Sequence, residues 1–596
     1  MSWRSGWPPA GAGWLVLSGF LLGLAFPPFH LLVPSFVALV PLGVWIAGLP
    51  PGREGRARAW RGGFFLGLIY YTLVFYWLLV ALIFYTPLAV PAFLVPVLIM
   101  CTLLALAVLG AHLCVTRLRW PIWLVLPVFW TADEWARAHL GDISFPWMQL
   151  GDSLSSYPWL IGAADLVGGR GLSFWLALVN GVLAYGFVAV RRREADEARR
   201  RETRTTEAPE TGRAAAARRV RGGLRSARGP AVGLLAALSI PIGYSAYRWN
   251  TLRMRPAATV AVIQPNIPED LKLAAKAATD SAVRATEFLV RERILYRSVA
   301  ARDAAGNGLA TAGGSDGGGP SEEATAADSS GIDLLLLPET ALVAYMDPIP
   351  SYGHRGRPDL AAWVAGLARR LDAEVLYGAL GSKDLGGGAF DYYNSAFLAD
   401  REGRRVGRYD KHYLVPVVER VPFLDPRWFR KLTYFGGFGV GGEPVVFPAG
   451  DAEFGVLICY ESIYSSLGRY YRNRGADFLV NITNDAWFGR RGAWWSRSSA
   501  LWQHPAHLVV RAIETRMGIA RSANTGISEI VDPLGRVHHR TSLFTADAFV
   551  GDVWTTDGRT FYARYGDVAG WTCLLLSLAA VGLALGGFKP RRPPVC

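Results

Sequence analysis

Three residues of this sequence stand where their side chains could act together as a nucleophile, a base and a stabilising cation. Cys459 follows the apolar run "FGVLI" in "EFGVLICYESIY" (453–464). Glu339 ends the run "IDLLLLPE", and Lys411 follows a strand-like segment in "GRYDKHYLVPVVERVPF" (407–423). The ends of strands are where α/β folds gather catalytic groups, and a thiol becomes a nucleophile beside a base or a positive charge. The three residues therefore suggest covalent catalysis by a thiol.

Each of these residues, taken alone, also has an ordinary structural explanation. A cysteine is often a small buried core residue, and most lysines and glutamates are solvated. The cysteine count leaves both explanations open: Cys459 is separated from the other four cysteines, which lie in or beside apolar segments or end the chain. A lone thiol in a non-cytoplasmic domain is a candidate nucleophile. No metal-ligand spacing such as C-x-x-C or H-E-x-x-H occurs, so we expect no metal.

The composition predicts a membrane-spanning part joined to a water-soluble part. The chain has 596 residues, of which 51% are hydrophobic and 18% charged, where soluble proteins usually have about a quarter charged. The net charge of +14 comes largely from arginines in short segments beside apolar runs. That pattern is typical of the cytoplasmic loops of membrane proteins, and we therefore expect no nucleic-acid partner.

Eight apolar segments are candidates for membrane spans. The clearest is 64–85, which holds no charged residue over a length that can cross a bilayer. The first segment resembles a signal peptide but offers no small-residue cleavage site, so we expect a retained anchor. The other seven segments, of which 120–133 is the weakest, are 10–29, 31–50, 88–115, 120–133, 171–190, 231–247 and 568–588.

The basic residues favour one orientation of these spans. Loops 51–62 and 191–229 and the C-terminal tail are rich in arginine, whereas 133–170 is rich in acidic residues. Because cytoplasmic loops carry the excess of lysine and arginine, we expect both termini in the cytoplasm. The predicted domains are a transmembrane domain at 1–247, an extracytoplasmic domain at 248–567, and a last span with a cytoplasmic tail at 568–596.

The extracytoplasmic segment alternates predicted strands with predicted helices, which indicates a layered α/β domain. The strands are expected at 258–266, 332–339, 373–380, 393–400, 405–409, 454–461 and 476–484, and the helices at 270–301, 357–371 and 500–517. Two segments poor in large apolar residues are predicted to be a flexible insertion, at 302–330, and a disordered cytoplasmic loop, at 191–229.

Taken together, the motifs resemble the carbon–nitrogen hydrolase (nitrilase) superfamily. That superfamily uses a Glu, a Lys and a Cys in this chain order on an αββα sandwich, and "LLLLPET", "YDKHYLVPVVERVP" and "GVLICYES" supply the three positions. The apolar spans and three further motifs make the sequence similar, over nearly its whole length, to the membrane-embedded apolipoprotein N-acyltransferase family. Those motifs are "VAVIQPNIPEDLK", "NITNDAWFG" and "RSANTGISEIVDPLGR".

The resemblance implies a role for each motif residue. Cys459 is expected to be the nucleophile, Glu339 the general base, and Lys411 the cation that stabilises the oxyanion together with a backbone N–H after the cysteine. Three further residues are expected to support this site: Glu419, Tyr460 and Glu461. Four aromatic residues are expected in a mobile arm at a lipid entrance, because aromatic side chains suit the membrane interface: Trp487, Phe488, Trp494 and Trp495.

The implied reaction is a two-step acyl transfer at the bacterial cytoplasmic (inner) membrane. Cys459 takes an acyl chain from a phospholipid, phosphatidylethanolamine by analogy with the family, and forms a thioester. The free amino group of the diacylglyceryl-cysteine of an apolipoprotein then takes the acyl chain as an amide, in the last step of lipoprotein maturation. No cofactor is implied. One chain carries the full set of residues, so we expect a monomer among membrane lipids.

Two other functions remain open at this point. A membrane-anchored amidase or nitrilase would use the same three residues on a small substrate with water as the acceptor, although a single span would suffice as its anchor. A transporter or scaffold would need no catalytic residues. A charged residue deep within a span would favour transport, and the long segments 64–85 and 88–115 contain no Asp, Glu, Lys or Arg.

Overall fold

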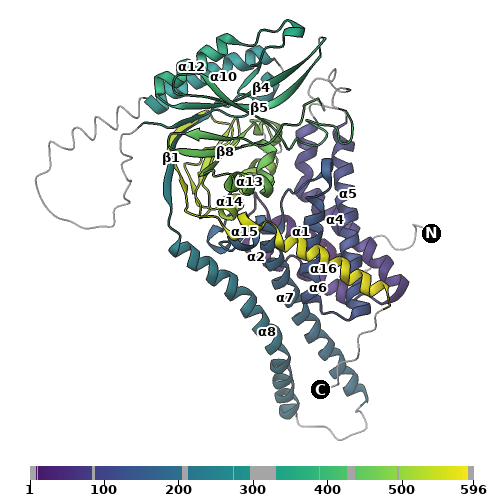
Figure 1. Ribbon diagram of the computed structural model, residues 1–596. Coiled ribbons are helices and arrows are strands. Elements are labelled where there is room, and N and C mark those ends of the chain that lie inside the picture. Colours follow the sequence, from purple (N-terminus) through teal and green to yellow (C-terminus); the bar gives the residue numbers. More distant parts are fainter. Residues whose placement is uncertain are drawn as a thin grey trace, which may run out of the picture. The chain divides into compact units, whose positions relative to one another are not determined.

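The computed structural model divides into two compact units (Figure 1). One comprises Met1–Leu252, Ser498–Glu514 and Thr560–Cys596, and the other comprises Arg253–Arg497 and Thr515–Arg559. The predicted insertion 302–330 lies outside the described residues. The structure describes residues 9, 11–83, 88–203, 212–272, 274–295, 331–387, 389–425, 428, 437–492 and 496–587.

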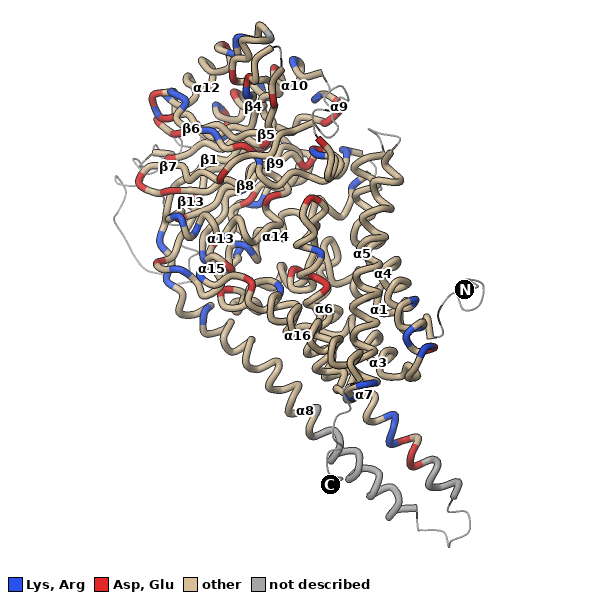
Figure 2. Tube along the Cα trace, turned by 45° about the vertical axis from the view of Figure 1, so that its right-hand side comes forward, with Lys and Arg blue, Asp and Glu red and all other residues tan. Residues whose placement is uncertain are grey.

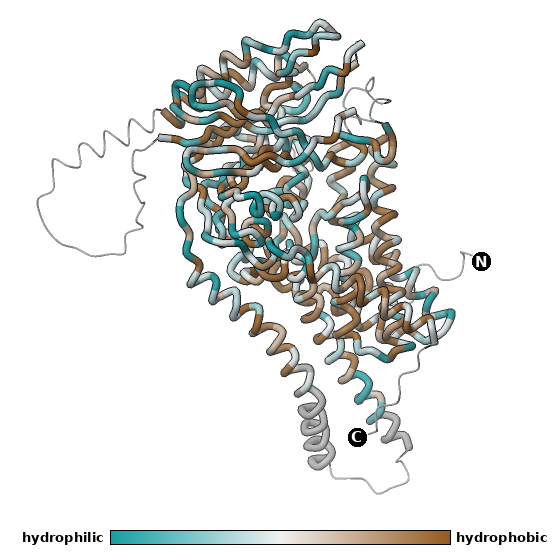
Figure 3. Tube along the Cα trace, in the orientation of Figure 1, coloured by the Kyte–Doolittle hydropathy of each residue, from teal (hydrophilic) through white to brown (hydrophobic). Residues whose placement is uncertain are grey.

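The first unit is built of helices, several of them apolar along most of their length (Figure 3). Over its 25 residues, α5 carries no Asp, Glu, Lys or Arg, so its trace is tan in Figure 2. The main helices of this unit are α1 (Ala12–Ala25), α2 (Leu32–Val37), α3 (Val40–Ala47), α4 (Gly52–Leu82), α5 (Ala89–Leu113), α6 (Ile122–Arg137), α7 (Ala164–Thr203), α8 (Gly212–Thr251), α15 (Phe561–Tyr565) and α16 (Val568–Leu585).

Four helices among the described residues are long and apolar enough to cross a membrane, and not the eight that the sequence predicted. Helices α1 and α2–α3 are apolar but shorter than a span, because the prolines after Ala25 end the first helix. Helix α6 has 16 residues and carries charge in its last turn. The four long segments are Gly52–Leu82, Ala89–Leu118, Ala164–Glu197 and Val568–Leu585.

The segment 191–229, predicted to be disordered, is helical wherever its backbone is described. Helix α7 continues to Thr203, and α8 begins at Gly212. The segment lacks large apolar residues, but it is rich in Ala, Arg and Glu, which are strong helix formers. A composition that cannot form a core can therefore still extend a helix that has already started.

The second unit contains two sheets, which confirms the predicted α/β class. The strand order of the first sheet is β13-β1-β2-β4-β5-β6, with β3 paired to β4, and β1, β2 and β4 run parallel. Its strands are β1 (Arg255–Gln264), β2 (Leu334–Leu336), β3 (Leu342–Tyr345), β4 (Glu374–Gly386), β5 (Ala389–Ala399), β6 (Arg405–Asp410) and β13 (Asp547–Thr555).

The second sheet has the order β12-β11-β10-β9-β8-β7, with β8, β9 and β10 parallel. Its strands are β7 (Val446–Ala449), β8 (Ala452–Ile458), β9 (Phe478–Thr483), β10 (Ile519–Ala523), β11 (Glu529–Val531) and β12 (Val537–His538). All six residues of β9 are buried, as expected for a parallel strand covered on both faces.

The two sheets face each other across an apolar core. Leu334 and Leu336 of β2 pack into this core against residues of β8 and β9, whereas Leu335 and Leu337 pack on the other face. That other face is covered by α10 (Ala275–Leu289) and α12 (Pro358–Leu371) (Figure 1). This alternation explains the continuous run of leucines, because side chains of a strand point to opposite faces in turn.

A helix also covers the outer face of the second sheet. Helix α13 (Ser465–Asn473) places Tyr471 against Gly455 of β8, and the Tyr471 hydroxyl donates to the carbonyl oxygen of Val456 at 2.8 Å. With α10 and α12 on the first sheet, the order of layers is helix, sheet, sheet, helix. The second unit is therefore an αββα sandwich, as the resemblance implied.

Helix α14 (Ala500–Thr515) was not expected outside the α/β domain. It lies between β9 and β10 in the chain, yet Ser498–Glu514 belongs to the helical unit. Its Gln503 accepts a hydrogen bond from the Trp147 indole at 2.8 Å, and its Glu514 accepts one from the Gly169 N–H at 2.7 Å. Buried polar contacts with the helices therefore hold α14.

Candidate active site

The carboxylate of Glu339 is held by three donors just beyond β2. Its Oε1 accepts hydrogen bonds from Asn394 Nδ2 at 2.7 Å and Lys411 Nζ at 3.3 Å, and its Oε2 accepts one from the Asn484 N–H at 2.7 Å. Burial alone would raise the pKa of Glu339, but Lys411, Asn394 and the Asn484 N–H together hold that pKa below its ordinary value. Glu339 is therefore an ionised carboxylate that can accept a proton.

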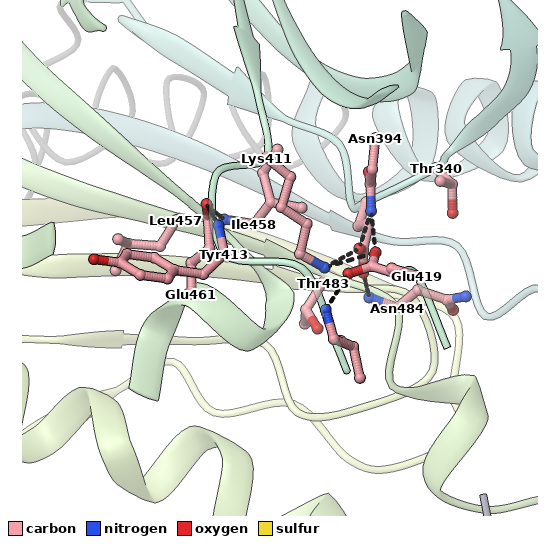
Figure 4. A network of polar contacts seen from close by, with 12 residues as sticks. Thr340, Asn394, Lys411, Tyr413, Glu419, Leu457, Ile458, Glu461, Thr483 and Asn484 are labelled. Carbon is pink, nitrogen blue, oxygen red and sulfur yellow. Dashed lines mark hydrogen bonds and ion pairs between the residues drawn. The ribbon is translucent and has the colours of Figure 1, made fainter. Parts of the chain in front are cut away.

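Lys411 is a buried ammonium group between two carboxylates. It follows β6, and its Nζ donates to Glu419 Oε1 at 2.9 Å as well as to Glu339. Burial would lower the pKa of Lys411, but Glu419 and then Glu339 raise it well above its ordinary value. Glu419 is in turn fixed by the Val415 N–H, which donates to its Oε2 at 2.8 Å. Figure 4 shows Lys411, Glu419 and Asn394 converging on this cluster.

Cys459 begins a sharp turn at the end of β8. Its φ of 50° lies in the left-handed region that side chains other than glycine rarely adopt, and a short 3₁₀ helix, Cys459–Ile463, follows. Burial and the neighbouring Glu339 carboxylate raise the pKa of the Cys459 thiol, while Lys411 opposes them. This direction favours the protonated thiol, and a thiol must lose its proton to a base before it can act as a nucleophile.

The carboxylate of Glu461 joins the turn that carries Cys459 to the loop that follows Lys411. Its Oε2 accepts from the Ile458 N–H at 2.7 Å, and its Oε1 accepts from the His412 N–H at 2.7 Å. The side chain is fully buried, and this burial raises its pKa. Glu461 therefore ties the turn at Cys459 to the loop after Lys411.

The remaining predicted residues lie at different places. Tyr460 is buried, and its ring meets that of Tyr464 edge to face with 5.5 Å between centroids. Trp487 is half-buried and Phe488 is buried, both in the short helix Asp485–Phe488. A role at a lipid entrance stays a prediction for these two aromatic residues. The other two predicted arm residues lie outside the described residues: Trp494 and Trp495.

Asn394 and Asn484 are contacts of Glu339 that the sequence did not predict. Asn394 lies in β5, where an amide among apolar residues was a signal that could have been noticed. Asn484 follows β9 in "NITNDAWFG", which the resemblance connected with an arm. Next to it, Asp485 forms an ion pair with Arg521 at 2.6 Å, and both side chains are fully buried. The two motifs therefore fix the loop that presents the Asn484 N–H to Glu339.

Comparisons with known proteins agree with this geometry. Residues 18–182 match the family model described as apolipoprotein N-acyltransferase N-terminal domain, and residues 259–557 match carbon–nitrogen hydrolase. The apolipoprotein N-acyltransferase of Geobacter metallireducens is 32% identical over 576 residues, which cover 96% of this chain and 94% of that protein. The chain belongs to the apolipoprotein N-acyltransferase family. This membership confirms the resemblance inferred from the motifs, and with it the class of enzyme, an acyltransferase.

Two further similarities of this acyltransferase are weaker. The apolipoprotein N-acyltransferase of Rhodopseudomonas palustris is 27% identical and matches 97% of this chain and 95% of its own length. Among solved structures, an amidase from Nesterenkonia sp. aligns with 53% of this chain and 95% of its own, at 16% identity and a TM-score of 0.30.

Among the described residues of this acyltransferase, no cluster of His, Cys, Asp and Glu is suited to hold a metal ion.

Proposed function

We propose that this acyltransferase moves an acyl chain from a phospholipid to the N-terminal amino group of the diacylglyceryl-cysteine of an apolipoprotein, through a thioester on Cys459. The observation that carries the proposal is the buried ion pair between Glu339 and Lys411, 3.3 Å apart, with Cys459 close enough to interact electrostatically with both. These are the base, the cation and the nucleophile that acyl transfer by a thiol requires. Family membership supports the choice of acceptor.

The first half-reaction forms the acyl-enzyme. Glu339 takes the thiol proton as the sulfur of Cys459 attacks the ester carbonyl of the phospholipid. The oxyanion that develops is stabilised by the Lys411 ammonium and by a backbone N–H after Cys459. When the tetrahedral intermediate collapses, the C–O bond breaks, Glu339 returns the proton to the leaving glycerol oxygen, and the lysophospholipid departs. The acyl chain remains as a thioester.

The second half-reaction reverses the direction of proton transfer at sulfur. The neutral α-amino group of the apolipoprotein attacks the thioester carbonyl, and Glu339 takes a proton from the attacking nitrogen. The C–S bond breaks, Glu339 passes that proton to the sulfur of Cys459, and the product is an amide. Both half-reactions use the same base and the same oxyanion contacts, which is the ping-pong arrangement of covalent catalysis.

We further propose that the donor is phosphatidylethanolamine and that the enzyme works as a monomer in the bacterial inner membrane. Four long apolar helices, with the shorter apolar helices α1 and α2–α3, support a multi-pass protein. The arginine-rich loops support a topology with cytoplasmic termini and an extracytoplasmic catalytic unit. A site outside the cytoplasm suits substrates that are both anchored in the outer leaflet.

The test uses the purified full-length protein and phosphatidylethanolamine with an alkyne-tagged acyl chain. Without an acceptor, we expect the tag on the peptide that contains Cys459, released by neutral hydroxylamine as thioesters are. Addition of a diacylated lipopeptide with a free amino terminus should move the tag to that peptide. Cys459→Ala should abolish labelling, whereas Cys101→Ala, which changes a buried cysteine of α5, should leave it unchanged.

Two results would contradict the proposal. An unmodified Cys459 in folded wild-type protein would exclude the phospholipid as acyl donor. A thioester that passes its acyl chain to water but never to the lipopeptide would instead support the membrane-anchored hydrolase. An N-acetylated lipopeptide, which has no free amino group, serves as the negative control for transfer.

A further inference from the structure

A second buried lysine lies beside the base. Lys272 ends the short helix α9 (Glu269–Lys272) and is 5% exposed. Its Nζ donates to the carbonyl oxygens of Glu339 at 3.4 Å and Thr340 at 3.2 Å, and to Thr340 Oγ1 at 2.9 Å. Three acceptors match the three N–H groups of a charged ammonium. Nothing in the two-step reaction described above uses this cation.

The turn that Lys272 contacts is strained. Thr340 has φ 45°, and the Ala341 N–H donates to the carbonyl oxygen of Pro338 at 3.2 Å, so residues 338–341 form a tight turn. A left-handed residue at this position of a turn is normally Gly or Asn, and a threonine there needs support from its surroundings. Lys272 supplies that support, because its ammonium binds the turn at two successive carbonyls and at the threonine hydroxyl.

Helix α9 is itself anchored to the site by its other end. Glu269 Oε2 accepts from Asn484 Nδ2 at 2.7 Å, and Asn484 is the residue whose backbone N–H binds Glu339. Asn524 connects the same elements, because its side chain donates to Asn484 Oδ1 at 2.8 Å and accepts from the Ile267 N–H at 2.8 Å. The motifs "QPNIPEDLK" and "RSANTG" are therefore joined through Asn484 to the base.

We propose that Lys272 is a positioning residue of the acyl transfer, which holds the Glu339–Thr340 turn in its strained conformation and keeps the Glu339 carboxylate ionised. The proposal rests on the proposed function, since it assigns Glu339 the role of base. Burial lowers the pKa of Lys272, while the carboxylates of Glu269 and Glu339 and the nearby Cys459 act against this shift. Lys272 in turn helps to hold down the pKa of Glu339. The groups facing Glu339 are thus two cations, Lys272 and Lys411, and two further carboxylates, Glu269 and Glu419.

Two substitutions with opposite predicted signs test this assignment. The readout is the rate of thioester formation on Cys459 from tagged phosphatidylethanolamine, measured across pH in the full-length enzyme. In Lys272→Met the Glu339 carboxylate loses a cationic neighbour, so the acidic limb of the profile should move to higher pH, by about one unit. In Glu269→Gln the same carboxylate loses an anionic neighbour, and the limb should move to lower pH. The matched control is Lys276→Met, an exposed lysine one turn further on, in α10.

The outcomes separate this inference from the proposed function. If wild-type enzyme forms no thioester, the proposed function fails whatever Lys272 does. If wild type and Lys276→Met form it and Lys272→Met has the control's pH profile, Lys272 is a structural residue only and the inference is overturned. Should Lys272→Met fail to fold, Lys272→Gln, which keeps an amide donor without the charge, decides in its place: a shift of the acidic limb to higher pH supports the inference, and an unshifted profile overturns it. Lys272→Arg, which keeps the charge, should leave the acidic limb of the pH profile unchanged.

Discussion

Asn394 and Lys411 donate hydrogen bonds to the same two carboxylate oxygens. Asn394 Nδ2 lies 2.7 Å from Glu339 Oε1 and 2.9 Å from Glu419 Oε1, and Lys411 Nζ lies 3.3 Å and 2.9 Å from the same atoms. Two buried carboxylates repel each other unless donors lie between them. The amide and the ammonium together therefore bridge the two carboxylates and offset their repulsion.

Removing the cation should damage both stability and activity. Lys411→Met leaves Glu339 and Glu419 without their shared charge, and breaking a buried ion pair costs about 3–5 kcal/mol. We expect a lower midpoint of thermal unfolding and no thioester on Cys459. Lys411→Met with Glu419→Gln should regain part of the stability but none of the activity. Lys383→Met, at an exposed lysine of β4, is the control, and a Lys411→Met protein that matches it would refute this account.

Glu461→Gln should separate the nucleophile from the cation without touching either. A carboxylate accepts at both oxygens, whereas a glutamine presents an NH₂ group either to the Ile458 N–H or to the His412 and Tyr413 N–H groups. Leaving a buried donor unpaired costs about 1–3 kcal/mol, and the turn at Cys459 should loosen. We expect slower thioester formation, measured beside Glu453→Gln, a control at an exposed residue near the start of β8. Equal rates in the two variants would show that Glu461 does not set the spacing.

A single methyl group at Gly378 should displace the base. A Cβ there would lie 2.5 Å from both the Pro338 carbonyl oxygen and the Thr340 N, which are backbone atoms of the turn that carries Glu339. A displacement approaching 1 Å can lower the rate by about 100-fold. Gly366→Ala is the control, because its Cβ meets nothing within 4 Å and should stabilise α12 slightly. Normal thioester formation by Gly378→Ala would mean that the turn tolerates movement.

The pH dependence of stability and of thioester formation should reflect an ionised Glu339 carboxylate and a protonated Cys459 thiol in the resting enzyme. The pKa of Glu339 in the folded protein lies below its ordinary value, so ionised Glu339 stabilises the fold at pH values above that ordinary value. This stability is lost as the pH falls through the pKa of Glu339 in the folded protein. Thioester formation should fall over the same acidic range. The raised pKa of Cys459 predicts no thiolate absorbance at neutral pH, compared with Cys459→Ser. A thiolate band at neutral pH would contradict base catalysis by Glu339.

The parts of the fold that local pattern determines were predictable. The run "IDLLLLPE" predicted a strand buried on both faces, and β2 has its leucines packed on alternate sides. The positions of Glu339, Lys411 and Cys459 at strand ends also followed from their motifs, and the structure gathers them into one network. Such features depend on residues close together in the sequence, which is why a single sequence reveals them.

Features that depend on distant partners were not predictable. Asn394 meets Glu339 across 55 positions, and Glu514 of α14 meets Gly169 across 345. The periodicity of α14 predicted a helix but carried no information on which unit would accept its polar groups. The predicted number of spans was wrong for a different reason. An apolar segment reports only its composition, whereas the length of the helix depends on where it ends, as at the prolines after Ala25.

The placement of α14 has a consequence for how the catalytic unit can be obtained. The chain passes between the two units four times, at 252–253, 497–498, 514–515 and 559–560. Two of these passages flank α14, which connects the loop bearing Asn484 to the strand that leads to Asn524. A fragment cut at 253 and 559 would carry α14 into water without the Trp147 and Gly169 contacts that satisfy its polar groups. Two cuts therefore cannot separate the second unit from the helical unit, because the chain between them includes α14, which belongs to the helical unit.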